Sequence, residues 1–444
     1  MIGIVKASIL KFTPQKLLFL YHLSLSQLGA LFYGYPSEKL IVIGVTGTSG
    51  KSTTVFILHS LLEGAGYAVG SLSTIAFRVG KEFQMNNRKM TMLGRFQTQK
   101  FLRKMVRAGC RYAIVETTSQ GIEQSRHRGI HYDLLLFTNL YPEHIEAHGG
   151  FENYKKAKLK LFDYLSKSKN KNIRKESIPK TIIVNGDDQY AGEFLNFQVD
   201  KKYAYTIENK DLSGIQVVKI EKPQANQEGV SLEIEGRSFY APVRGMHNLK
   251  NISAALTVGH ALSISWEDLG KSTRNLPPVP GRLEYLNEGQ KYDVVVDYAF
   301  EPRAMESLHD TLRPFGYKKI IQVLGGTGGG RDKARRPIIG KMAAQFATVV
   351  IVTNEDPYDE NPREIMNQVE VGALEAGKKD GTNLFVIEDR RQAIAKAIFL
   401  AEPGSLILIT GKGSEQAMVG PHGKFFLWDD REVAREEIKK ALNK

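Results

Sequence analysis

The sequence predicts an α/β protein with two parallel-sheet domains and a short helical segment before them. Its length of 444 residues exceeds what one hydrophobic core usually serves. In both halves, short runs rich in Val, Ile and Leu alternate with helix-like segments, a pattern typical of parallel sheets covered by helices. We therefore expect a helical segment over 1–38, a central domain over 39–278 and a Rossmann-like, doubly wound C-terminal domain over 279–444.

The charge and cysteine content narrow the classes of partner. An excess of 61 Lys and Arg over 48 Asp and Glu gives a net charge of +13, which favours anionic partners such as nucleotides, pyrophosphate-bearing substrates or an acidic membrane face. The sequence contains no continuous basic run interleaved with aromatic residues, so nucleic acid is not expected as a partner. The single cysteine, Cys110, excludes an internal disulfide and agrees with a reducing, cytoplasmic location.

The first segment superficially resembles a secretion signal, because Lys6, Lys11 and Lys16 precede an apolar run from Leu17 to Phe32. Polar residues such as His22 interrupt that run, and it is shorter than a comfortable membrane span. We expect a helix over 15–33 that packs on the body of the protein, with peripheral membrane contact as the alternative.

The stretch IVIGVTGTSGKSTT at 41–54 carries the first chemical information. Its spacing from Gly44 to Gly50, Lys51 and Ser52 fits a phosphate loop, in which backbone amides surround phosphate oxygens, the lysine reaches the outer phosphates and the hydroxyl ligates Mg²⁺. The loop lies between a β-branched strand and a helix-compatible segment, as that mechanism requires. The central domain is therefore predicted to be a phosphate-loop ATPase domain.

Polar residues follow two further predicted strands of this domain. Glu116 ends the strand Tyr112 to Val115, and Asn139 follows the strand Leu134 to Thr138, with His144 shortly after it. Because ligands of parallel sheets gather at the carboxyl ends of strands, all three residues are expected beside the phosphate loop. Glu and His can there ligate a cation next to a triphosphate.

Lys158 is out of place in the helix pattern FENYKKAKLKLFDYL. It falls inside the apolar stripe, where an ammonium is costly unless it is paired, neutral or chemically changed. A neutral amine can add CO₂ and become a carbamate, an acidic metal ligand. A lysine that snorkels to the surface or pairs with a carboxylate is the simpler alternative.

The ordered motifs GVTGTSGKSTT, ETTSQGIEQSRHRGIHYDLLLFTNLYPEHIEAHGG, HNLKNISAA, PVPGRLE, DYA, GGGRDKARRP and ITGKGSE resemble those of the Mur ligases. Within that family the chain is similar to the MurE type, which adds the third residue of the peptidoglycan stem peptide. The resemblance covers about 40–444 and implies ATP, two Mg²⁺ ions and CO₂ as a carbamate on Lys158. It implies catalytic roles for Lys51, Glu116, His144 and Lys158, and metal ligation by Ser52, Glu116, His144 and Lys158.

The resemblance also assigns the binding residues. ATP is expected at Gly47, Thr48, Gly50, Lys51, Ser52, Thr53, Asn139, Asn248, Asn251, Arg282 and Asp297. The muramoyl peptide is expected at Thr91, Ser119 and Arg126, and the incoming amino acid at Arg331, Glu355, Asp356, Tyr358, Gly411 and Glu415. The chain departs from the family in having Met-Thr-Met-Leu at 90–93, where Asn-Thr-Thr-Pro is usual, and Gln120 in place of a histidine.

The second half is predicted to contain short antiparallel strands over 203–245, a helix over 249–262, and a proline-rich linker at 276–281 before the last domain. In the last domain, Tyr358 stands where diaminopimelate-adding relatives usually have arginine. The carboxylates of Glu355, Asp356 and Glu415 favour a side-chain ammonium, so lysine is expected slightly ahead of diaminopimelate.

These features predict an ATP-dependent ligase that joins an amino acid to a muramoyl dipeptide through an acyl phosphate. The alternatives are a related ligase acting on a lipid-linked precursor, pseudomurein or folyl-polyglutamate, and a nucleotide-binding scaffold without ligation. Only about forty residues precede the phosphate loop, where this type carries a uridine-nucleotide domain, so a lipid-linked acceptor stays open. A monomer is expected.

Overall fold

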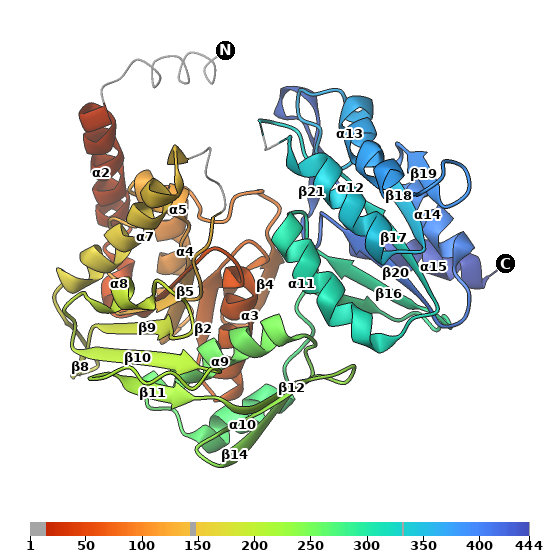
Figure 1. Cartoon of the computed structure of the whole chain (residues 1–444). Coiled ribbons are helices and arrows are strands. Elements are labelled where there is room, and N and C mark those ends of the chain that lie inside the picture. The colour runs from red at the N-terminus through yellow and green to blue at the C-terminus, as the bar shows by residue number, and fades with distance from the viewer. Residues whose placement is uncertain (1–14, 143–147, 331–332, 444) are drawn as a thin grey trace.

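A computed structural model describes residues 15–142, 148–330 and 333–443. It contains two α/β bodies side by side, each built around its own parallel sheet (Figure 1). The predicted α/β class with two parallel sheets is therefore confirmed. Side chains up to Val279 belong to the cores of the first body, and those from Leu283 onward belong to the cores of the second.

The central sheet has the strand order β11-β10-β9-β6-β1-β5-β2-β3-β4. Its parallel strands are β1 (Ile41–Thr46), β2 (Val69–Leu72), β5 (Tyr112–Glu116), β6 (Leu134–Phe137), β9 (Thr181–Asn185), β10 (Lys201–Thr206) and β11 (Gln216–Lys219). The antiparallel strands β3 (Ala76–Val79) and β4 (Glu82–Met85) form one edge. Strand β1 lies between β5 and β6, so the segments after these three strands meet at one edge of the sheet.

The prediction of antiparallel strands over 203–245 is wrong for its first half. Strands β10 and β11 pair in parallel and extend the central sheet. Within 203–245, the antiparallel strands are β12 (Glu221–Ala225), β13 (Val230–Ile234) and β14 (Arg237–Ala241), which form a separate small sheet. Short alternating runs do not reveal strand direction, which here depends on the crossover that precedes each strand.

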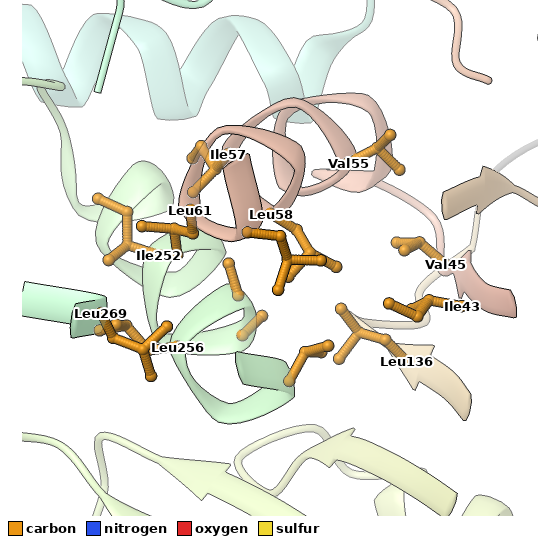
Figure 2. Close-up of a cluster of buried hydrophobic side chains, with 14 of the residues drawn as sticks. Ile43, Val45, Val55, Ile57, Leu58, Leu61, Leu136, Ile252, Leu256 and Leu269 are labelled. Atoms are coloured by element: carbon orange, nitrogen blue, oxygen red, sulfur yellow. The ribbon is translucent and has the colours of Figure 1, made fainter. Parts of the chain in front are cut away.

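Helices cover both faces of the central sheet. On one face, α3 (Lys51–Gly64) and α9 (Met246–Ala261) pack together with α10 (Trp266–Arg274), and their apolar side chains share one core cluster with Ile43, Val45 and Leu136 of the sheet (Figure 2). The other face carries α4 (Arg95–Arg107), α5 (Ser119–Glu123), α7 (Phe151–Ser166) and α8 (Ala191–Leu195). The central body also contains a small antiparallel hairpin formed by β7 (Lys171–Ile173) and β8 (Glu176–Ile178).

Gly44 shows why the middle of β1 needs glycine. A Cβ atom there would lie 2.6 Å from Leu135 Cδ2 and 2.8 Å from Tyr132 Cε1. Such distances are too short for any side chain, so glycine lets the layer on this face close against the strand that leads into the phosphate loop.

The C-terminal sheet has the order β15-β16-β20-β17-β18-β19. Its strands are β15 (Glu284–Leu286), β16 (Asp293–Asp297), β17 (Lys319–Leu324), β18 (Val349–Thr353), β19 (Leu384–Ile387) and β20 (Ser405–Thr410), all parallel except β15. The helices are α11 (Pro302–Leu312), η2 (Arg313–Phe315), α12 (Arg335–Phe346), α13 (Pro362–Glu375), α14 (Arg390–Leu400) and α15 (Asp430–Leu442). The hairpin of β21 (Ala417–Val419) and β22 (Phe425–Leu427), joined through η3 (Pro421–Gly423), projects from the end of this sheet.

Helix α2 (Gln15–Phe32) lies at the outer edge of the central body and is followed by η1 (Pro36–Lys39) (Figure 1). It packs against α4, as expected for a helix on the body of the protein. None of the helices within the described ranges is long and apolar enough to cross a membrane.

Candidate active site

The phosphate loop has the shape that a triphosphate requires. Helix α3 begins at Lys51, directly after Gly50, whose left-handed backbone (φ 78°) turns the loop into the helix. Among the described residues no side chain caps the helix, and its first turn contains no acidic residue, so no described side chain competes with a ligand for its N-terminal amides. Lys51 Nζ donates to Thr48 O over 2.7 Å and so folds back across the loop. The segment therefore fits an anionic ligand of the ATP phosphate type.

The strands beside β1 hold this loop in place. Asn139 Oδ1 accepts from Ser49 N at 2.9 Å, and Thr48 N donates to Asn139 O at 2.9 Å. A Cβ atom on Gly47 would lie 2.0 Å from Thr138 Oγ1. The loop thus packs directly on the residues that follow β6, and a side chain at Gly47 would push it away.

Glu116, at the end of β5, faces the start of α3. Its Oε1 accepts from Ser52 Oγ at 2.9 Å, while its Oε2 accepts from Thr74 N at 2.8 Å and from Thr74 Oγ1 at 3.1 Å. The carboxylate is almost completely buried. A hydroxyl and a buried carboxylate beside a phosphate loop are hard oxygen donors that suit Mg²⁺.

Lys158, on α7, is buried as the apolar stripe predicted, with 1% of the residue exposed. Its Nζ donates to Gly47 O at 2.8 Å and lies 4.6 Å from the centre of the Tyr154 ring. Tyr154 in turn donates to Thr48 Oγ1 at 3.1 Å. The apolar stripe of α7 therefore places the Lys158 amine against the backbone of the phosphate loop and away from solvent.

The predicted ligand His144 and the predicted substrate residue Arg331 lie outside the described residues. Within the described ranges, no group of three or more His, Cys, Asp or Glu side chains forms a metal cluster. The metal donors that the structure describes beside the loop are Ser52 and Glu116.

The predicted nucleotide residues from later in the chain also approach α3 or the space between the two bodies. Asn251 Oδ1 accepts from Thr54 Oγ1 at 3.2 Å, and Asn251 Nδ2 donates to Asn248 Oδ1 at 3.1 Å. Arg282 lies over the Tyr298 ring, and burial lowers its pKa although Asp297 opposes that shift. Thr53, next to the loop, is buried in the first turn of α3.

Nearby backbone amides donate hydrogen bonds to the Asp297 carboxylate. Its Oδ2 accepts from Leu283 N at 2.6 Å, and its Oδ1 accepts from Ala299 N at 2.7 Å. These bonds fix the carboxylate at the end of β16. Each oxygen retains a lone pair for a further donor such as a ribose hydroxyl.

The residues predicted to meet the acceptor lie on the central body near Glu116. Thr91 Oγ1 is 2.8 Å from Thr74 Oγ1, the same hydroxyl that contacts Glu116. Ser119 begins α5, and its Oγ is 3.0 Å from His148 Nε2. Arg126 instead donates to Gln124 Oε1 over 2.9 Å and to Met92 O, and burial lowers its pKa.

On the C-terminal body, the predicted amino-acid residues separate into two groups. Glu355 is buried against Thr327, whose hydroxyl donates to it at 2.8 Å, and burial raises the pKa of this carboxyl. A Cβ atom on Gly411 would lie 2.3 Å from Glu355 Oε2. Tyr358 adopts a left-handed backbone (φ 51°), and its N–H donates to Val419 O at 3.1 Å.

Asp356 and Glu415 form the second group, around two lysines. Lys412 Nζ lies 3.0 Å from both Asp356 carboxylate oxygens and 2.7 Å from Glu415 Oε2. Lys89, from the central body, contacts Asp356 as well and lies 3.1 Å from Glu415 Oε2. Burial lowers the pKa of Lys89, whereas Glu415 and Asp356 raise the pKa of Lys412 against the effect of its burial. We call Lys89, Asp356, Lys412 and Glu415 the interdomain ion cluster.

Sequence reasoning did not assign Thr74, Lys89, Lys412 or His148 to the site. Lys412 lies inside the quoted ITGKGSE motif and could have been found there. Thr74 and Lys89 lie in turns with no motif, and only the folding of β3 and β4 brings them to Glu116 and Asp356.

Comparison with known proteins assigns the class. Residues 45–259 match the Mur ligase middle domain, and residues 281–413 match the Mur ligase, glutamate ligase domain. A UDP-N-acetylmuramyl-tripeptide synthetase of Roseiflexus sp. (strain RS-1) is 33% identical over 425 residues, which is 94% of this chain and 82% of that protein. The chain belongs to the Mur ligase family, whose members are ATP-dependent ligases.

Further relatives indicate the branch of the family. A UDP-N-acetylmuramoyl-L-alanyl-D-glutamate–2,6-diaminopimelate ligase of Thermosynechococcus vestitus is 35% identical over 426 residues, covering 94% of this chain and 80% of that protein. A solved structure of a ligase with the same name matches with a TM-score of 0.61 at 25% identity, over 91% of this chain and 79% of that one. The predicted resemblance to the MurE type is thereby confirmed.

Proposed function

We propose that this protein ligates a diamino acid to a muramoyl-dipeptide precursor in the cytoplasm at the cost of ATP. One observation carries the proposal: a buried glutamate and a buried lysine converge on the phosphate loop. Glu116 reaches Ser52 at 2.9 Å and Lys158 reaches Gly47 at 2.8 Å. Across from them, the interdomain ion cluster links the loop before Thr91 to the C-terminal body.

The proposed reaction has two steps. The acceptor carboxylate attacks the γ-phosphorus of ATP, and the bond between that phosphorus and the β–γ bridging oxygen breaks. ADP departs with the bridging oxygen, and the acceptor now carries an acyl phosphate. The amino group of the incoming amino acid then attacks the acyl carbon, phosphate leaves with the carbon–oxygen electron pair, and the amine loses a proton. Lys51 and the amides of α3 neutralise and orient the transferred phosphoryl group.

Metal binding is assigned to the oxygen donors at the loop. We assign one Mg²⁺ to Ser52 and Glu116 together with the nucleotide, and a second to His144 and a carbamate on Lys158. Mg²⁺ supplies charge neutralisation on the transferred phosphoryl group. The position of Lys158 supports the carbamate, because the buried side chain brings its amine within 2.8 Å of Gly47 O, next to the phosphate loop where a metal ligand is needed.

The carbamate has a specific test. Lys158→Ala is expected to abolish ligation, with partial recovery on addition of acetate, which restores a carboxylate, and none on addition of carbonate. Lys167→Ala is the matched control, since Lys167 lies just after the same helix with an exposed side chain. Full activity of the Lys158 variant without additive would remove the carbamate from the mechanism.

The ion cluster changes the expected amino acid. The sequence favours lysine because three carboxylates, those of Glu355, Asp356 and Glu415, are expected to accept an ammonium. In the structure, Lys412 and Lys89 already contact Asp356 and Glu415, and Glu355 is buried against Thr327. Because these carboxylates are already engaged, the site no longer favours a substrate with a side-chain ammonium over one with a second carboxylate. Together with the names of the relatives, this supports diaminopimelate as the first candidate.

The decisive experiment measures phosphate release by the full chain with ATP and Mg²⁺. UDP-linked and lipid-linked muramoyl dipeptide are each combined with diaminopimelate, lysine, ornithine or glutamate, and the product mass is determined. We expect phosphate release that requires both acceptor and amino acid, and that is absent in Lys51→Ala. ATP hydrolysis independent of every amino acid would refute ligation. Sedimentation during turnover tests the further proposal that the active form is a monomer.

A further inference from the structure

Helix α2 is oriented with most of its large apolar side chains toward solvent. Its fully buried residues, Ser26, Gly29 and Ala30, are small or polar, and Leu18, Leu23 and Leu25 are half-buried. Ser26 Oγ donates to Ser125 O at 2.6 Å, and Gly29 packs on the backbone of Arg95. The exposed large side chains are Leu17, Phe19, Leu20, Tyr21, Leu28, Leu31 and Phe32.

This arrangement reverses the pattern of an ordinary surface helix, which buries its apolar stripe and exposes its polar one. Phe32 is 74% exposed, and Leu17 and Leu31 are each more than half exposed. Single exposed apolar residues are normal, but a contiguous set along one helix indicates an interaction surface. Figure 1 shows α2 at the rim of the molecule, away from the C-terminal body.

Basic residues continue this surface. The ring of Phe32 lies 6.2 Å from the ring of Phe96 at the start of α4. From Phe96, the exposed positions Lys100, Lys104 and Arg107 follow at spacings of four, four and three residues, so they share one face of α4. Neither α2 nor α4 contains an acidic residue. We call the exposed apolar residues of α2, with Phe96, Lys100, Lys104 and Arg107, the α2–α4 surface.

We propose that the α2–α4 surface docks the protein on an anionic lipid bilayer. A projecting helix with leucines and aromatic rings can enter the headgroup region without a shaped groove, and the lysines and arginine of α4 are attracted to acidic headgroups. The charge complementarity selects this occupant over a neutral apolar partner. The helix lies on the membrane rather than across it.

The position of the surface ties it to the proposed acceptor site. Ser26 is bonded to Ser125, which precedes Arg126, and Arg126 contacts Met92 beside Thr91. Docking would therefore bring the acceptor side of the central body to the bilayer, where a precursor anchored by a lipid tail is presented. This last step rests on the proposed ligase function, whereas membrane docking itself does not.

Vesicle flotation of the full chain tests the docking. The protein is mixed with vesicles of phosphatidylcholine alone or of phosphatidylcholine with phosphatidylglycerol, without ATP or substrate. We expect binding to the anionic vesicles at least about tenfold stronger than to the neutral ones. The triple variant Leu28→Ser, Leu31→Ser, Phe32→Ser is expected to lose about tenfold or more in affinity, and Lys100→Gln with Lys104→Gln is expected to abolish the preference for anionic lipid.

The matched control is Phe399→Ser with Leu427→Ser, which removes two highly exposed apolar side chains from the C-terminal body. It should bind vesicles like the wild type. Absent or equal binding to both vesicle types overturns the proposal. Wild-type self-association that the triple variant loses, without vesicle binding, would assign the surface to a second copy and also overturn it. Ligation of a soluble acceptor, measured in parallel, reports separately on the proposed function.

Discussion

Acid is expected to destabilise the phosphate-loop helix through His59. This residue lies on α3 and is fully buried, and within the described ranges neither ring nitrogen has a hydrogen-bond partner. The nearest carboxylate oxygen in an ion-pair arrangement, Glu63 Oε2, is 3.9 Å from Nε2. Burial, assisted by the positive charge of Arg78, lowers the pKa of His59 from 6.5 to about 3.

The direction and size of the effect follow from proton linkage. Below pH 6.5 the unfolded chain binds a proton at His59 that the folded chain does not bind, so stability falls as the pH falls, down to about pH 3. Each pH unit below 6.5 costs about 1.4 kcal/mol. Lowering the pH from 7 to 5 should therefore remove about 2 kcal/mol of unfolding free energy through His59 alone.

Urea unfolding of wild type and His59→Leu at pH 7 and pH 5 measures this difference, and hydrogen exchange of the α3 amides reports it locally. The pH-dependent loss should be about 2 kcal/mol smaller in the leucine variant. His59→Gln, which also lacks a titrating group, should behave in the same way. His422→Gln is the control, because the His422 side chain is 98% exposed. Equal losses in wild type and both His59 variants would refute the reasoning.

Three further perturbations have defined outcomes. Glu116→Gln removes the charge beside Ser52 and should lower apparent Mg²⁺ affinity by about 10-fold or more, measured by calorimetry with Mg²⁺ and ADP; unchanged affinity would exclude Glu116 as a ligand. Lys89→Gln removes the central body's ammonium from the ion cluster and should raise the radius of gyration in small-angle scattering, while Lys167→Gln should not. Gly340→Ala places a Cβ atom 1.9 Å from a carbonyl oxygen of α13 and should cost about 1–3 kcal/mol in urea unfolding. Gly192→Ala, in open space, should be close to neutral, and equal stability of the two alanine variants would contradict the packing argument.

The sequence predicted the parts of the fold and site that depend on local pattern. The phosphate loop follows from the spacing of its glycines, lysine and serine, and the strand that ends at Glu116 follows from a short apolar run. The burial of Lys158 follows from the helical spacing of the apolar residues around it. Strand direction does not follow from such a run, and therefore β10 and β11 were placed in the wrong kind of sheet. The predicted roles of the site residues in binding remain predictions.

Long-range polar contacts were the least predictable feature. Lys89 and Asp356 are separated by 267 positions, and nothing near Lys89 indicates that its ammonium would reach the other body. The charge of Asp356 and Glu415 is visible in the sequence, but the sequence does not show that Lys89 and Lys412 lie against it. Helix α2 was expected to pack on the body, which it does, yet a stripe of apolar residues gave no sign that it would face outward.

The ion cluster has a consequence for how ionic strength should act on the protein. Each body keeps its own apolar cores, while Lys89 joins them through charge. Other contacts between the bodies are also polar or cationic, such as Arg303 over the Tyr141 ring and Thr311 beside His247. Added salt screens charges that reach solvent, such as Arg303, whereas it acts much less on the buried contacts of Lys89 and leaves apolar packing intact. Concentrated salt should therefore loosen the exposed contacts between the two bodies, while each body stays folded and Lys89 keeps its contacts with Asp356 and Glu415.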